Sequence, residues 1–134
     1  MIRPLESDDR NAAIGLWHAC GLTRPWNDPR ADFDRALHGP SSVLLGDFGD
    51  RALRGTAMVG HDGHRGWVYY LGVDPAYRGK GVGQALMAAC EAWLRECGIP
   101  KIQVMVRGDN AATRGFYDAL GYGLDDVVVY SRRF

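Results

Sequence analysis

The sequence predicts a mixed α/β fold in which a mostly antiparallel central sheet is flanked by about four helices and contains one parallel pair of strands. Three observations support this fold. Strand and helix patterns follow one another in the order β-αα-βββ-α-β-α-β along the chain, short turns join three consecutive strands, and a long helix separates two others. A strand-helix-strand unit of this kind places its two strands in parallel. Because the 134 residues contain no linker or repeat, we interpret residues 1–134 as one domain.

The first part of the chain predicts a short strand over residues 2–5 and then two helices. The first helix runs to about Cys20, the second begins at Pro29, and residues 21–28 form an irregular loop between them. Helices begin at small polar residues and end at glycine or proline. The residues of these types are the N-cap candidates Ser7, Asp8 and Asp28, and the stop signals Gly21, Gly39 and Pro40.

Residues 42–48, 54–61 and 67–73 have strand patterns, and they are joined by turns at Gly49-Asp50 and at residues 62–64. Such short connections predict an antiparallel meander. The third of these strands is apolar on both faces over residues 67–71. We therefore expect it to be a central strand that is covered on both sides.

The strongest helix signal is a stripe of eight apolar residues at helical spacing from Val82 to Cys97. Cys90 lies on the same stripe, and we expect both thiols to be buried. Three further elements follow: a strand over 101–107, a shorter helix from Asp109-Asn110 to about residue 120, and a final strand over 127–131.

Composition and charge narrow the classes of function. Hydrophobic residues make up 46% and charged residues 24% of the chain, which is typical of globular proteins. The 16 basic and 16 acidic residues balance, so we expect no electrostatic attraction to nucleic acid or to a membrane surface. No apolar run approaches the roughly 20 residues of a membrane span, and we expect no secretory signal. Three cysteines without paired spacing favour a reducing compartment, so the expected localisation is cytoplasmic.

The segment that indicates chemistry is the glycine loop, residues 78–83, with the sequence Arg-Gly-Lys-Gly-Val-Gly between a strand and the strongest helix. Glycines let backbone N–H groups approach a ligand closely, and the beginning of a helix attracts negative charge. Two cations add to this attraction. The loop therefore predicts an anion site, and the alternative is a tight turn with two solvated side chains.

Two common phosphate-binding motifs do not fit the glycine loop. A P-loop would need glycine at position 74 and Ser or Thr at position 81, where the chain has Asp74 and Gly81. A dinucleotide fingerprint would need glycine at position 84 and an acidic residue near position 99, where the chain has Gln84 and Ile99.

Two segments resemble the signatures of a known family. Residues 71–83, Leu-Gly-Val-Asp-Pro-Ala-Tyr-Arg-Gly-Lys-Gly-Val-Gly, resemble the acetyl-coenzyme A motif of the GNAT superfamily of N-acetyltransferases, Arg/Gln-x-x-Gly-x-Gly/Ala. Residues 110–122 resemble its second signature, Asn-x-x-Ala-x-x-Phe-Tyr-x-x-x-Gly-Phe/Tyr, with Thr113 where alanine is usual. The element order matches as well. Residues 23–30 further resemble the bacterial YpeA-like branch.

The resemblance implies a GNAT-like fold in which the two parallel strands splay apart and acetyl-CoA, the co-substrate, lies in the gap. The pyrophosphate would bind the amides of the glycine loop. The backbone of Leu71 and Val73 would bind the pantetheine arm, and the Val73 N–H would polarise the thioester carbonyl. The cofactor-binding residues that the resemblance implies are Leu71, Gly72, Val73, Arg78, Gly79, Lys80, Gly81, Val82, Gly83, Asn110 and Tyr117.

The same resemblance implies two roles in the second signature. Tyr117 would be the catalytic residue, a general acid that protonates the departing thiolate; the alternative is that it only packs on the apolar face of its helix. Asn110 would contact the coenzyme, and as a residue at the beginning of a helix it is also an N-cap.

The acceptor site is less marked in the sequence. A neutral amine needs a general base, and the candidates are Glu6, Asp28 and Tyr69. The family often binds acceptors with its first two helices and their loop, so residues 23–28 would line the pocket. Within that loop Trp26 is the best pocket candidate, whereas Trp17 fits the core better. The substrate-binding candidates are therefore Trp26, Asp28 and Tyr69.

The resulting hypothesis is an enzyme that transfers an acetyl group from acetyl-CoA to a primary amine of a small molecule, peptide or protein. One alternative is a non-catalytic sensor of coenzyme A. The other is a small nucleotide-binding module, and that module would leave residues 110–122 unexplained. We expect no metal, because His61 and His64 supply only half of a site. The resemblance also allows a homodimer.

Overall fold

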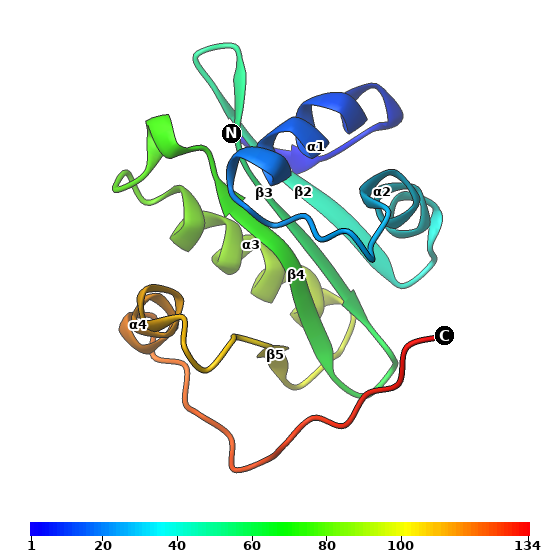
Figure 1. The fold of residues 1–134 in the computed structure, drawn as a ribbon, viewed down its shortest axis with the longest axis vertical. Helices are drawn as coiled ribbons and strands as arrows, with labels where there is room; N and C mark the ends of the chain where they lie inside the picture. Colours follow the sequence, from blue (N-terminus) through cyan, green and yellow to red (C-terminus); the bar gives the residue numbers. More distant parts are fainter. The chain divides into compact units, whose positions relative to one another are not determined.

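The computed structural model describes residues 1–134, and these form two compact units, residues 1–104 and 105–134. The first unit contains a five-stranded sheet in which the strands follow the order of the sequence (Figure 1). The first four strands are antiparallel neighbours, and the fifth runs parallel to the fourth. This confirms the mostly antiparallel sheet with one parallel pair. The strands are β1 (Ile2–Pro4), β2 (Ser42–Gly49), β3 (Ala52–His61), β4 (Gly66–Val73) and β5 (Ile102–Val104).

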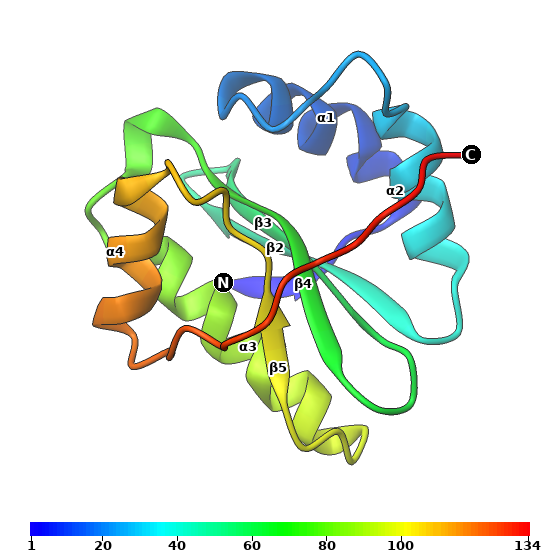
Figure 2. The same ribbon diagram turned by 60° about the horizontal axis from the view of Figure 1, so that its bottom comes forward.

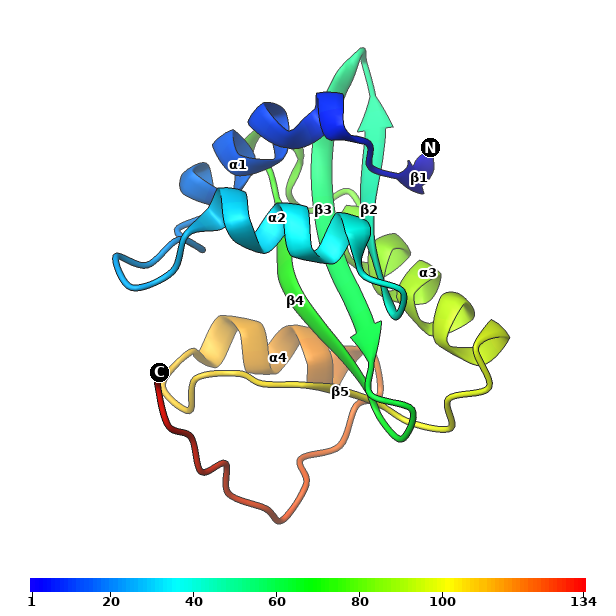
Figure 3. The same ribbon diagram turned by 90° about the vertical axis from the view of Figure 1, so that its right-hand side faces the viewer.

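Helices cover both faces of this sheet (Figures 2 and 3). Neighbouring residues of a strand point to opposite faces, and β3 shows which helices lie on each. Thr56 accepts a hydrogen bond from Trp17 in the first helix, whereas a Cβ added at Gly55 would touch Val82 in the third. The helices α1 (Arg10–Ala19) and α2 (Pro29–His38) therefore lie on one face, and α3 (Val82–Glu96) lies on the other.

Each face has its own core. On the face of α1 and α2, Trp17, Phe33 and Leu44 are fully buried, and a side chain of this size stabilises the fold by roughly 1.5–3 kcal/mol when it is buried. On the other face α3 buries Cys90, and burial raises the pKa of that thiol to about 12. Cys97, expected to be buried, is exposed because it follows the last residue of α3, where the helix ends.

The beginnings of the first two helices differ in how well the sequence predicted them. A 3₁₀ turn (η1, Ser7–Asp9) precedes α1, so Ser7 and Asp8 are not its caps. Instead Asp9 accepts a hydrogen bond from the Glu6 N–H at 2.8 Å. The prediction for α2 is confirmed, because the Asp28 carboxylate accepts from the N–H groups of Arg30 and Ala31 at 3.0 and 3.3 Å.

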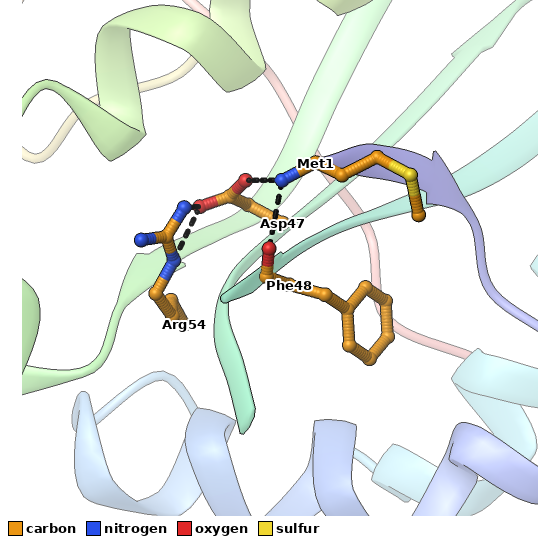
Figure 4. Close-up of polar contacts among 4 residues, drawn as sticks. All are labelled: Met1, Asp47, Phe48 and Arg54. Carbon is orange, nitrogen blue, oxygen red and sulfur yellow. Dashed lines mark hydrogen bonds and ion pairs between the residues drawn. The ribbon is translucent and has the colours of Figure 1, made fainter. Parts of the chain in front are cut away.

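A buried carboxylate organises the corner where β1, β2 and β3 meet (Figure 4). Asp47 has 5% exposure and accepts from the guanidinium of Arg54 and, at 3.2 Å, from the terminal amine of Met1. That amine also donates to the carbonyl of Phe48 at 2.7 Å. The register of the sheet shifts between Asp47 and Phe48. The β2–β3 turn falls at Asp50–Arg51, one residue later than predicted, and both residues have left-handed backbones.

The sheet is shorter than predicted towards the end of the chain. The strand expected over 101–107 is only the three residues of β5, because it pairs with Gly66, Trp67 and Val68 of β4 and no further. The strand expected over 127–131 does not form: those residues join no ladder, and Val127, Val128 and Val129 are exposed. Apolar β-branched residues favour a strand only where a partner edge accepts their hydrogen bonds.

The second unit contains α4 (Ala111–Ala119), which begins and ends as predicted. Asn110 is its N-cap, and the side-chain oxygen accepts from the Thr113 N–H at 3.1 Å. No helix of the protein has the length and apolar character that a membrane crossing requires.

Candidate active site

The geometry of the site begins at an irregularity in β4. Tyr69 pairs with Met58 and Gly72 pairs with Thr56, so Tyr70 and Leu71 together lie opposite one residue of β3. This is a β-bulge. Tyr70 has a left-handed backbone, φ 51°, which costs on the order of 1–3 kcal/mol for a residue with a side chain. The surrounding contacts compensate for this cost: Trp17 donates to the Thr56 hydroxyl at 2.9 Å, and Thr56 donates to the Tyr70 carbonyl at 3.0 Å.

Beyond the bulge, β4 has an unpaired edge. Its pairing with β5 ends at Val68, while the strand continues to Val73. The Asp74 N–H donates to the carbonyl of Arg54 in β3 at 2.8 Å. Backbone groups alternate between the two edges of an antiparallel strand, so those of Leu71 and Val73 face the unpaired edge. The Val73 carbonyl accepts there from the Arg78 guanidinium at 3.2 Å.

The close approach of the residues that follow α1 explains Gly72 without any ligand. A Cβ at this position would lie 2.9 Å from the Leu22 side chain and 3.1 Å from the sulfur of Cys20. The Cys20 thiol also donates to the Val73 carbonyl at 3.3 Å. The end of α1 thus packs directly beneath the last residues of β4.

The glycine loop has the backbone that an anion site needs. Gly79 and Gly81 are left-handed, with φ 77° and 80°, and a Cβ at either would meet nothing within 4 Å. Their conformation, rather than lack of space, therefore requires glycine. Gly81 is the N-cap of α3, and the first hydrogen bond within the helix joins the Ala85 N–H to its carbonyl at 3.0 Å. The N–H groups of residues 82–84 consequently have no acceptor within the helix.

The side chains of the loop add positive charge. Lys80 is exposed, and its Nζ lies 5.5 Å from the centre of the Tyr77 ring, which also has the Arg54 guanidinium at 5.8 Å. A helix of 15 residues begins here, and its dipole favours an anion near its first turn. Gly83 differs from the other two glycines because it is a buried residue within α3.

In the second unit, the ring of Tyr117 lies against two aromatic neighbours. The ring centre is 5.1 Å from that of Phe116, in an edge-to-face arrangement, and 5.4 Å from that of Tyr122. The Tyr122 N–H donates to the Tyr117 carbonyl at 3.0 Å. These contacts hold the tyrosine in a fixed position on α4.

An open cavity of about 750 Å³ lies on the face of the sheet that α2 covers. Of the three predicted substrate-binding residues, Tyr69 lines it and is 45% exposed. Asp28 serves as the N-cap of α2, and Trp26 is 53% exposed outside the cavity wall. The exposure of Tyr69 corrects the prediction of a strand covered on both sides. The lining residues are Leu22, Asn27, Asp32, Arg35, Ala36, Gly39, Pro40, Ser41, Ser42, Met58, Gly60, His61, Asp62, Trp67, Tyr69 and Tyr70.

Sequence reasoning missed the polar centre of this cavity. The Tyr70 hydroxyl donates to Asp32 Oδ2 at 2.6 Å, and Arg35 donates to Asp32 Oδ1 at 2.7 Å. Burial, and then the hydrogen bond to Asp32, raise the pKa of Tyr70 well above its usual range. Burial also raises the pKa of Tyr69. Because Asp32 and Tyr70 are 38 residues apart, no short-range sequence pattern predicts their contact.

The mixed sheet whose parallel pairing ends at Val68, the bulge in β4 and the glycine loop are together typical of the class of acyltransferases that use acetyl-CoA. The chain belongs to the acetyltransferase (GNAT) family, whose model matches residues 6–122. The resemblance of the sequence to the GNAT family is thereby confirmed, and the protein is an acetyltransferase. Members of this family bind coenzyme A or acetyl-CoA.

Named relatives agree with this assignment. Acetyltransferase SG1711 of Sodalis glossinidius is 46% identical over 129 residues, which are 96% of this chain and 90% of the relative. Acetyltransferase YPTB2753 of Yersinia pseudotuberculosis is 44% identical over 133 residues, 98% of this chain and 94% of the relative.

A solved structure has the same fold. The acetyltransferase AAC(6')-Iy, in complex with the bisubstrate analogue CoA-S-monomethyl-acetylneamine, has a TM-score of 0.86 at 20% identity, over 100% of this chain and 97% of that one. At this identity the likeness concerns the fold alone.

Proposed function

We propose that this acetyltransferase transfers the acetyl group of acetyl-CoA to a primary amine that is bound in the cavity. The observation that supports the proposal is that one strand, β4, contains both the residues that line the cavity and the edge proposed to bind the coenzyme. Tyr69 and Tyr70 of β4 line the cavity, and the unpaired edge at Leu71 and Val73 follows within roughly 10 Å of strand. An amine in the cavity would thus lie beside the position of the thioester.

The coenzyme would bind mostly to the backbone. The outward-facing backbone groups of Leu71 and the N–H of Val73 would hydrogen-bond the bound coenzyme as an added strand does, and the amides and cations of the glycine loop would receive the pyrophosphate. The Val73 N–H would donate to the thioester oxygen, on which negative charge develops as the amine attacks. Asn110 would be a further contact, as the family signature supports, in addition to its role as a helix cap.

The reaction would proceed by direct attack. The amine nitrogen bonds to the thioester carbon, the tetrahedral intermediate collapses, and the C–S bond breaks. The amine loses one proton and the thiolate gains one. On the strength of its place in the second signature we assign Tyr117 as the acid that protonates the thiolate. Of the three candidate bases only Tyr69 lines the cavity.

Two measurements on the same preparation test this function. Calorimetry measures the binding of acetyl-CoA, and an assay of thiol release measures its turnover with a panel of amines. We expect binding and amine-dependent release, with an acetylated amine found by mass spectrometry in equal amount. Binding without turnover on any small amine or peptide would contradict the proposed acceptor, and absence of binding would contradict the coenzyme site.

A matched variant locates the acceptor. Met58 lines the cavity, and Met58→Trp would fill part of it. We expect this variant to raise the KM for the amine and to leave the affinity for acetyl-CoA unchanged. An unchanged KM would place the acceptor elsewhere.

A further inference from the structure

Asp32 presents one exchangeable carboxylate oxygen to the cavity. Its Oδ2 accepts from Tyr70 at 2.6 Å, a short bond typical of a hydroxyl and a charged carboxylate. Its Oδ1 accepts from Arg35, whose side chain is 73% exposed. Exposed ion pairs are screened by water and contribute only about 0–1 kcal/mol. A cation that enters the cavity can therefore replace Arg35 at Oδ1.

The bond on the other oxygen is held in place. The Tyr70 ring stacks on buried Trp17 with centres 4.0 Å apart and an angle of 16° between the planes. Thr56 fixes the carbonyl of the same residue. Because ring and backbone are both anchored, the hydroxyl of Tyr70 keeps the carboxylate of Asp32 in one orientation.

The rest of the wall also favours a cation. Trp67 and Tyr69 present further aromatic rings, and Asp62 is a second carboxylate. Aromatic faces attract ammonium groups. The backbone N–H of Arg65, and then that of His64, hold the pKa of Asp62 below its ordinary value, so this residue is charged at neutral pH. Arg35 supplies the main opposing charge, and it is the group that a cation would displace.

We infer that Asp32 determines specificity by binding a cationic group of the acceptor, so that the preferred acceptor carries a second, protonated amine in addition to the amine that reacts. Tyr70 is a positioning residue that keeps the carboxylate oriented. The inference rests on the proposed function in one respect, because it places the acceptor in this cavity. A diamine is the simplest molecule of this class.

The experiment compares 1,5-diaminopentane with pentylamine, which has the same chain but no second charge. We expect the wild-type kcat/KM to favour the diamine by roughly tenfold, as one charge-assisted hydrogen bond predicts. Asp32→Asn keeps an acceptor for the Tyr70 hydroxyl but removes the charge, and it should abolish that preference through a higher KM. Asp32→Glu keeps the charge and should restore part of it. Tyr70→Phe should raise the KM for the diamine without changing kcat.

Two further variants separate this inference from its alternatives. Asp34 is on the same helix but bonds to Arg10 at 3.0 Å, away from the cavity, so Asp34→Asn is the matched control and should keep the preference. Arg35→Ala removes the competing cation and should lower the KM for the diamine. If Arg35 instead bound a carboxylate of the acceptor, the diamine would gain nothing from this change and amino acids would lose turnover.

A binding measurement separates failure of this inference from failure of the proposed function. The affinity of 1,5-diaminopentane for the CoA-bound protein is measured by calorimetry for the wild type and for Asp32→Asn. Weaker binding to the variant supports the cation site even if neither amine is acetylated, in which case only the proposed function fails. The inference is overturned if the diamine binds equally to both proteins or to neither. It is also overturned if the preference for the diamine remains in Asp32→Asn.

Discussion

Arg54 holds the buried carboxylate of Asp47 through two nitrogens that reach the same oxygen, Nε at 3.0 Å and Nη2 at 2.8 Å. The Asp47 side chain is 7% exposed and that of Arg54 is 26% exposed. The pair lies where the register of β2 shifts, and it connects this strand to β3 and to the amine of Met1. It therefore stabilises the edge of the sheet that is opposite to the parallel pair.

Replacing Asp47 should destabilise the protein strongly. Asp47→Ala leaves the Arg54 guanidinium partly buried without its partner, and removing one partner of a buried pair costs about 3–5 kcal/mol. Urea denaturation would measure the loss. The control is Asp34→Ala, whose ion pair with Arg10 is more exposed on both sides, and which should cost under about 1 kcal/mol. Equal losses in the two variants would argue against a special role for the buried carboxylate.

The glycine loop should depend on its backbone more than on its charges. Gly81→Val forces a branched side chain into a left-handed backbone, which costs roughly 1–2 kcal/mol, and it moves the N–H groups at the beginning of α3. We expect a large loss of acetyl-CoA affinity by calorimetry. Lys80→Ala removes one exposed charge and should weaken binding by only a few-fold.

Gly83→Val should also weaken binding, but in this variant part of the effect should appear as lower stability because Gly83 is buried. The reverse order, with Lys80→Ala the most damaged, would show that charge dominates the site.

Elements with strong local signals were predicted correctly. The cap at Asp28, the apolar stripe of α3 and the cap at Asn110 each depend on residues a few positions apart. The glycine loop was also predicted from the sequence, because a left-handed backbone favours glycine at positions 79 and 81.

What the sequence could not predict depends on distant partners. The valines at 127–129 have a strand pattern, but a strand forms only with a partner edge, and residue type does not say whether one exists. The bulge at Tyr70 is held by contacts with Trp17 and Thr56, and the pairing of Tyr70 with Asp32 depends on the packing of α2 on the sheet. For the same reason the sequence indicates Trp26 and Asp28, which lie in or next to an irregular loop, more readily than Asp32, which lies within a regular helix.

Tyr117 should affect turnover rather than binding. Tyr117→Phe keeps the ring that packs against Phe116 and Tyr122 and removes the proton that the thiolate would receive. General acid catalysis contributes roughly 10²–10⁴ in rate, so we expect kcat to fall by about 100-fold or more while acetyl-CoA affinity changes little. Tyr122→Phe is the control, because the family signature accepts either residue at that position. A Tyr117→Phe enzyme with normal turnover would remove the assignment.

Acid should weaken the fold partly through Asp9. Its carboxylate accepts hydrogen bonds from Arg3 at 2.9 and 3.2 Å, and these bonds hold its pKa below the ordinary value of 3.8. A carboxyl whose pKa is lower in the folded state stabilises that state fully above the pKa of the unfolded chain. It loses this contribution as the pH falls from about 4 through the lowered pKa of the folded protein.

The Asp9→Asn variant isolates that contribution. At neutral pH it should be less stable than the wild type by about 1 kcal/mol, the size of a partly exposed charged hydrogen bond. As the pH falls below 4 the two free energies of unfolding should converge, since the wild type then loses what the variant already lacks. Denaturation curves at several pH values would show this. The control is Asp8→Asn, at an exposed neighbouring position, whose free energy of unfolding should follow that of the wild type at every pH. If the difference between Asp9→Asn and the wild type stayed constant with pH, the hydrogen bonds of Asp9 would stabilise the fold independently of its charge.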